Sequence, residues 1–157
     1  MDKGTDAEKK LHVLSQIAKA LNERGVIWAV GASGMLYLNG VTDTFHDLDI
    51  MVSEACAECA EEALAALGRL IERNPNPQYR TKRFLEYTVA DVEVDMMAGF
   101  VIVKGGISYP APFDETHIEK YVEVDGQTVP LQSLSDWERY YTLMNRPAKA
   151  AMCRRKE

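Results

Sequence analysis

Two carboxylates interrupt an apolar run in the first third of the chain. Asp47 and Asp49 lie one residue apart in the segment HDLDIMV, among large apolar residues. Side chains alternate between the two faces of a strand, so both carboxylates point to one face, while Leu48 and Ile50 point to the other. Two acids this close repel each other unless a cation lies between them. The pattern therefore predicts a strand that packs into a core on one face and holds a cation on the other.

A third acid lies on a later segment with the same alternation. In VEVDMM, Val94 and Met96 point to the core and Asp95 points to the opposite face. Mg²⁺ prefers oxygen ligands and shares them with nucleotide phosphates. Three strand carboxylates can hold two metal ions about 3.5–4 Å apart, an arrangement that clamps the attacking and leaving oxygens of phosphoryl transfer. Glu93 shares this face and is the alternative third ligand, but Asp95 has the shorter side chain and is preferred.

The periodicity along the chain predicts helices and strands in alternation, followed by mostly strands and a last helix. The 157 residues favour a single domain, residues 1–157, with a mixed sheet and helices packed on it, in the α+β (α/β) class. The expected helices are 5–25, 33–40, 54–73 and 133–144, and the expected strands are 26–30, 46–52, 79–89, 92–103, 120–124 and 127–131. Residues 105–117 are expected to form a loop, and a break at Asn145-Arg146-Pro147 is expected to lead into a basic tail.

Three segments in a fixed order resemble a known superfamily. VGASGMLYLNG, HDLDIMV and VEVDMM resemble the DNA polymerase β-like nucleotidyltransferases, whose signature is a glycine turn opening a short helix, a strand with two acids, and a third acid on a later strand. The final segment, through LMNRPAK, is also similar to that family. The resemblance is strongest to small single-domain members of the lincosamide type or of toxin–antitoxin systems. It implies a nucleotidyltransferase-like mixed β-sheet flanked by helices.

The resemblance implies a role for each matching residue. Asp47 and Asp49 would bind both metal ions, and Asp95 would bind the catalytic ion and help to deprotonate the attacking hydroxyl. Gly31 and Ser33 would contact the triphosphate, because exposed N–H groups and the dipole of the following helix favour an anion there.

Two basic residues are further candidates for phosphate contacts. Arg80 and Lys82 share one face of the strand before the acid-bearing strand, and the alternative is a solvated strand. The sequence departs from the family pattern at Ala32, where many members have a second glycine or a serine. It also has His46 and two threonines before the acids, where many small antibiotic-modifying members carry an arginine. His46 is expected to be a structural histidine on the face opposite Asp47.

The predicted activity is metal-dependent transfer of a nucleoside monophosphate from a nucleoside triphosphate, with ATP expected, to a hydroxyl of a small molecule or protein, releasing pyrophosphate. Two Mg²⁺ ions are the expected cofactors. The alternative is a non-catalytic nucleotide- or partner-binding module of the same fold. A net charge of −6 argues against broad nucleic-acid binding. A homodimer or a toxin–antitoxin partner is expected.

The location expected from the sequence is the cytoplasm. The first ten residues contain no apolar segment of the kind that a secretory signal requires, and no apolar run has the length of a membrane span. Three cysteines, an odd number, are typical of a reducing compartment.

Overall fold

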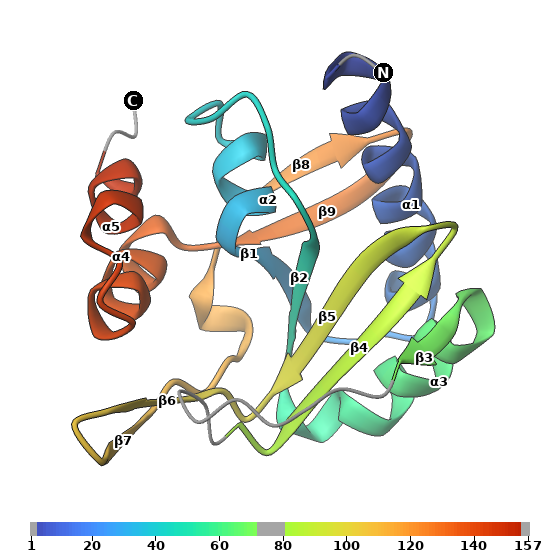
Figure 1. Ribbon diagram of the computed structural model, residues 1–157. Coiled ribbons are helices and arrows are strands. Elements are labelled where there is room, and N and C mark those ends of the chain that lie inside the picture. The colour runs from blue at the N-terminus through green and yellow to red at the C-terminus, as the bar shows by residue number, and fades with distance from the viewer. Residues whose placement is uncertain (1–2, 72–80, 155–157) are drawn as a thin grey trace.

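The segments around Asp49 and Asp95 form neighbouring strands of a seven-stranded mixed sheet (Figure 1). The computed structural model describes residues 3–71 and 81–154. Its helices are α1 (Lys3–Glu23), α2 (Ala32–Leu38), α3 (Ala57–Leu67), α4 (Leu134–Leu143) and α5 (Pro147–Cys153), with short 3-10 turns at Glu54–Cys56 and Glu115–His117. Its strands are β1 (Trp28–Gly31), β2 (Leu48–Val52), β3 (Arg69–Ile71), β4 (Arg83–Val89), β5 (Val92–Ala98), β6 (Val101–Lys104), β7 (Ile107–Pro110), β8 (Ile118–Val124) and β9 (Gln127–Gln132).

The strand order in the sheet is β3-β4-β5-β2-β1-β9-β8. β2 pairs in parallel with β5, and β1 pairs in parallel with β9, whereas the other neighbours are antiparallel. This confirms the predicted mixed sheet with flanking helices. None of the helices in the described parts of the chain has the length and apolarity needed to cross a bilayer.

Alternation along the strands divides the sheet into an apolar face and an acid-bearing face. Leu48 and Ile50 are fully buried. Their face also carries Trp28, whose indole Nε1–H donates a 2.9 Å hydrogen bond to Asn22 of α1. Asp49 and Asp95 therefore point away from α1, and α4 and α5 lie beside the acid-bearing face (Figure 1).

The predicted helix 54–73 is wrong from Gly68 to Ile71, and residues 72 and 73 lie outside the described residues. Residues Arg69–Ile71 form the edge strand β3, paired antiparallel with β4, and Leu70 is 54% exposed instead of packing on a helix. Gly68 makes this pairing possible, because a Cβ atom there would lie 2.3 Å from the backbone oxygen of Thr88. The pairing of β3 with β4 is a long-range contact that local periodicity does not reveal.

The predicted strand 92–103 is two strands in different sheets. It breaks at Gly99, whose φ of +67° lies in the left-handed region that favours glycine. Beyond it, β6 pairs with β7 in a separate hairpin, so the predicted loop 105–117 is partly strand. Gly105 and Gly106 both have positive φ angles, as the two-residue turn of a hairpin requires.

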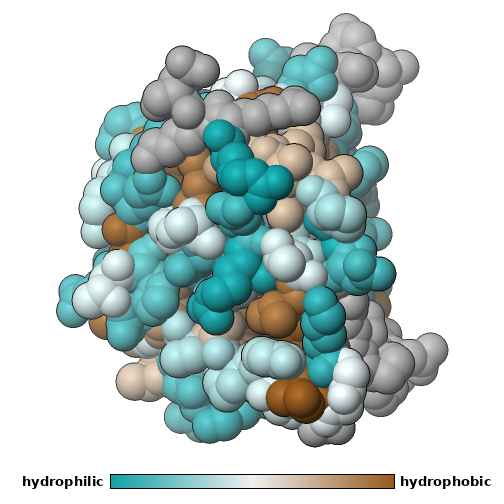
Figure 2. Space-filling view, turned by 90° about the vertical axis from the view of Figure 1, so that its left-hand side faces the viewer, coloured by the Kyte–Doolittle hydropathy of each residue, from teal (hydrophilic) through white to brown (hydrophobic). Residues whose placement is uncertain are grey.

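The predicted tail after Asn145 is wrong up to Cys153. Residues Pro147–Cys153 form α5, with Pro147 in the first helical turn, where a missing N–H is tolerated. α5 folds back beside α4, and Arg154 forms an ion pair with Glu138. Seen from the side of these two helices, the surface is mostly hydrophilic, with small hydrophobic areas (Figure 2).

Candidate active site

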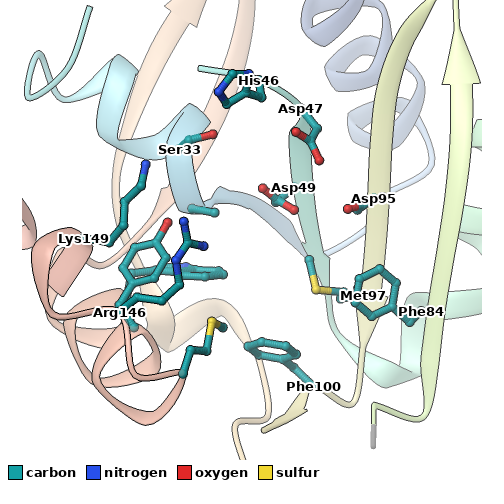
Figure 3. A pocket seen from close by; sticks show the side chains of 14 residues that line it. Ser33, His46, Asp47, Asp49, Phe84, Asp95, Met97, Phe100, Arg146 and Lys149 are labelled. Atoms are coloured by element: carbon teal, nitrogen blue, oxygen red, sulfur yellow. The ribbon is translucent and has the colours of Figure 1, made fainter. Parts of the chain in front are cut away.

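Three carboxylates converge on the acid-bearing face of the sheet. Each of Asp47, Asp49 and Asp95 offers one oxygen, and these oxygens lie within 4.8 Å of one another (Figure 3). All three residues are partly buried, and Oδ1 of Asp95 is fully shielded from solvent. Three oxygen donors at this spacing fit a hard divalent cation, which would offset their mutual repulsion.

The register of the sheet explains why these acids meet. Asp49 on β2 is the register partner of Asp95 on β5, and Gly31 on β1 is the partner of Asp49. Asp47 lies two residues before Asp49, directly ahead of the strand. Glu93, the alternative third ligand, does not belong to this group; together with Asp47 it lines a different hollow next to α1.

The carboxylates form one wall of a cavity of about 340 Å³ (Figure 3). Ser33, Arg146 and Lys149 lie across the cavity from the acids, and aromatic and sulfur-containing side chains complete the walls. The lining residues are Ala32, Ser33, His46, Asp47, Asp49, Phe84, Asp95, Met97, Phe100, Trp137, Tyr141, Met144, Arg146 and Lys149.

Arg146 and Lys149 are basic residues of this cavity that the sequence analysis did not select. Arg146 is the N-cap residue of α5 and Lys149 lies in the first turn of that helix, and both side chains point into the cavity (Figure 3). The guanidinium of Arg146 lies 5.5 Å from the ring centroid of Tyr141, over its face. The segment NRPAK was interpreted as a helix breaker and a tail, although its similarity to the family was the signal that could have identified these cations.

Of the two basic residues expected to contact phosphates, Lys82 does not line the cavity. Arg80 lies outside the described residues. The ammonium of Lys82 lies 3.2 Å from the Glu54 carboxylate, and its alkyl chain packs beside Gly99. Lys82 therefore borders a different hollow, with Glu54 and Arg83.

The turn after β1 differs in detail from the interpretation based on the family. Ser33 lines the cavity, as expected, but Gly31 does not. A Cβ atom on Gly31 would lie 2.5 Å from the Trp137 ring, so glycine makes room for that ring. Ala32 has a φ of +52°, in the left-handed region that glycine adopts more easily.

His46, which is expected to be structural, and the buried Trp137 also border the cavity. His46 lies beside Asp47 instead of on the opposite face, because β2 begins only at Leu48 and strand alternation does not extend to His46. Trp137, which helical spacing assigns to the core, is 2% exposed and contributes to the cavity wall.

The sheet and its three carboxylates define a class, the nucleotidyltransferase fold of the DNA polymerase β-like kind. No protein-family model and no curated protein matches the sequence. Among solved structures, a protein from Thermotoga maritima, provisionally described as a nucleotidyltransferase, is similar with 25% identity and a TM-score of 0.73, over 93% of this chain and 91% of that one.

Two antibiotic-modifying proteins share the fold at lower identity. ANT(2″)-Ia in complex with adenylyl-2″-tobramycin has 14% identity and a TM-score of 0.62, over 92% of this chain and 87% of that one. The lincosamide antibiotic adenylyltransferase LnuA with bound lincomycin has 11% identity and a TM-score of 0.60, over 94% of this chain and 96% of that one. Together with the first structure, these similarities confirm the resemblance in fold: the chain has the fold of the small nucleotidyltransferases of the DNA polymerase β-like kind, which supports an enzyme.

Proposed function

We propose that this protein transfers a nucleoside monophosphate from a nucleoside triphosphate, ATP by preference, to a hydroxyl group and releases pyrophosphate. The observation that carries this proposal is the cavity in which Asp47, Asp49 and Asp95 face Arg146 and Lys149. A metal–nucleotide complex would place its metal ions against the carboxylate wall (Asp47, Asp49 and Asp95) and its phosphates against the cationic wall (Arg146 and Lys149). It therefore complements both walls.

The three carboxylates would hold two divalent ions. These ions would stabilise the negative charge that develops on the transferred phosphate. Asp47 and Asp49 would bind both ions. Asp95 would bind the ion near the acceptor and take the proton from the attacking hydroxyl. The acceptor oxygen forms a bond to the α-phosphorus, and the bond from that phosphorus to the bridging oxygen of pyrophosphate breaks.

The opposite wall suits the leaving pyrophosphate. The Arg146 guanidinium and the Lys149 ammonium can donate charge-assisted hydrogen bonds to phosphate oxygens, and these bonds strengthen as negative charge develops. Ser33 adds a hydroxyl donor on the same side. Phe84, Met97 and Phe100 offer apolar surface on which a nucleobase can stack.

The acceptor we propose is a hydroxyl of a small molecule, with a protein hydroxyl as the alternative. The two antibiotic-modifying neighbours are described with adenylyl-2″-tobramycin and with lincomycin, both products or ligands of small size. The cytoplasmic location and a homodimer or toxin–antitoxin partner stay predictions.

The activity can be tested by incubating the purified protein with Mg²⁺, each α-labelled nucleoside triphosphate and a panel of hydroxylated compounds, and measuring pyrophosphate. Pyrophosphate release with ATP, dependent on an acceptor, is expected. Nucleotide binding without release under every condition would instead support the non-catalytic alternative.

The cationic wall can be tested separately by measuring ATP affinity. Arg146→Ala and Lys149→Ala should each weaken the binding of Mg·ATP by about tenfold, since each removes a charge-assisted contact. Lys82→Ala is the matched control, because it removes a lysine that pairs with Glu54 outside the cavity. Equal losses for Lys82→Ala and Arg146→Ala would contradict the assignment of the phosphates to α5.

A further inference from the structure

Trp137 lies where the acid-bearing sheet meets the helical pair α4–α5. On the side of the sheet, its ring fills the space above Gly31, where an added Cβ atom would lie 2.5 Å from Cζ2 of the indole. Gly31 has a φ of −119°, which any residue adopts, so the glycine is required for space and not for backbone conformation. Gly31 is the register partner of Asp49, which in turn is the partner of Asp95. The indole therefore packs directly beside the strand positions that carry these two carboxylates.

A buried amide fixes the orientation of the indole. The Nε1–H of Trp137 donates a 3.1 Å hydrogen bond to Oε1 of Gln132, which is fully buried at the end of β9. The amide nitrogen of Gln132 in turn donates to Asp136 Oδ2 at 3.0 Å and to the Tyr140 hydroxyl at 3.2 Å. Rotating the indole would leave a buried donor and a buried acceptor unpaired, which is costly for groups removed from solvent.

On its other side, Trp137 connects to the cationic wall. Its ring centroid lies 5.4 Å from that of Tyr141, and the Arg146 guanidinium lies 5.5 Å from the centroid of the Tyr141 ring. Tyr141 and Arg146 both line the cavity. A continuous series of contacts therefore runs from the strand partner of Asp49, through Trp137 and Tyr141, to the first cation of α5.

We infer that Trp137, held by Gln132, is a positioning residue that sets the spacing between the carboxylate wall and the cationic wall. This inference rests on the proposed function, because it assumes that a nucleotide spans the two walls. A ligand that touches both walls, such as a metal–nucleoside triphosphate complex, depends on their spacing. A metal ion alone touches only the carboxylate wall and does not depend on it.

The first experiment compares two ligands on one variant. Isothermal titration calorimetry would give the affinity of Trp137→Phe for Mn²⁺ alone and for Mn·ATP. We expect the affinity for Mn·ATP to fall by about tenfold and that for Mn²⁺ to stay within about twofold, because only the first ligand spans both walls. A residue that merely stabilises the fold would lower both affinities together or neither.

Trp28→Phe is the matched control. Trp28 is also almost fully buried and also donates its indole hydrogen bond to a side-chain oxygen, that of Asn22. The Trp28 side chain lies on the face of β1 opposite the acid-bearing face. The variant should therefore lose stability while keeping both affinities within about twofold of wild type. Thermal melting would verify that each variant is folded.

A second pair of variants tests the contact with Gly31 directly. Gly31→Ala places a methyl group against the indole and should weaken Mn·ATP binding by more than about tenfold, because overpacking displaces one wall. Adding Trp137→Phe to Gly31→Ala should restore the affinity to that of Trp137→Phe alone, since the smaller ring leaves room for the methyl group.

The outcomes separate this inference from the proposed function. If wild type binds neither Mn²⁺ nor Mn·ATP, the proposed function fails and the inference fails with it. If wild type binds both, but Trp137→Phe changes the two affinities equally, or Trp28→Phe weakens Mn·ATP as much, or the double variant shows no rescue, the inference is overturned and the proposed function stands.

Discussion

Asp49 of β2 and Asp95 of β5 are register partners on adjacent parallel strands. Neighbouring strands lie about 4.8 Å apart, so two acids in register on one face bring their carboxylates to the spacing at which they can share a metal ion. Asp47 completes a group whose oxygens lie within 4.8 Å of one another. A divalent cation between these three acids would offset their mutual repulsion, and this expectation leads to the first two predictions.

Divalent metal should stabilise the fold. Mn²⁺ or Mg²⁺ at a hundred times its dissociation constant should add about 2.7 kcal/mol to the free energy of unfolding, and thus raise the melting temperature by several degrees. ATP should raise it further. The Asp47→Asn/Asp49→Asn double variant should lose this response while melting no earlier than wild type without metal, because it relieves charge repulsion. A wild-type melting curve indifferent to millimolar Mn²⁺ and ATP would count against the site.

Asp95 and Glu93 should separate in kinetics. Asp95→Asn should leave nucleotide binding largely intact, because Asp47 and Asp49 remain, but it should lower the rate of transfer by orders of magnitude, since the acceptor-side ion and the proton acceptor are lost. Glu93→Gln should change the rate little, because Glu93 lies outside the carboxylate group. Single-turnover transfer rates would measure both effects, and a Glu93→Gln defect as large as that of Asp95→Asn would reverse the assignment.

Ala32→Gly should stabilise the turn that follows β1. Ala32 has a φ of +52°, a conformation that costs a residue with a Cβ atom about 1–2 kcal/mol. Part of this gain is offset by the greater freedom of glycine in the unfolded chain, so a net stabilisation of about 0.5 kcal/mol is expected in chemical denaturation. Ala29→Gly, at a fully buried position of β1, is the control and should destabilise the folded protein. Destabilisation by both variants would show that the Cβ atom of Ala32 packs favourably.

Stability should decline steeply above pH 10 because of Tyr140. Burial raises the pKa of Tyr140 to about 12, and the nearby Asp136 carboxylate adds to this increase. The folded protein therefore keeps the phenol proton at pH values where the unfolded chain has lost it, and stability falls as pH rises from about 10 to 12, by roughly 2–3 kcal/mol.

Tyr140→Phe should remove this part of the pH dependence, although it costs about 1 kcal/mol at neutral pH through the lost hydrogen bond with Gln132. Tyr121→Phe is the matched control, because Tyr121 is 63% exposed. Denaturation profiles at pH 8, 10 and 11.5 would measure the difference. Parallel profiles for wild type and Tyr140→Phe would mean that the phenol titrates as in the unfolded chain.

The carboxylate group could be predicted because it follows from local geometry. Alternation in a strand is a property of the backbone, so HDLDIMV and VEVDMM predict the faces of Asp49 and Asp95 without any knowledge of their neighbours. The two-residue connections between expected strands 79–89 and 92–103, and between 120–124 and 127–131, could be predicted for the same reason, since short turns depend on a few adjacent residues.

The sequence by itself thus determined which acids share a face and which class of fold can hold them. Only the tertiary structure decided what lies across from them: Arg146 and Lys149 reach the cavity because α5 folds back on α4, and Gly31 is a glycine because Trp137 packs against it. It also decided that Lys82 pairs with Glu54, away from the acids. Periodicity is set by neighbours along the chain, whereas the walls of a cavity are set by which distant elements pack together, and that choice depends on the free energy of the whole fold.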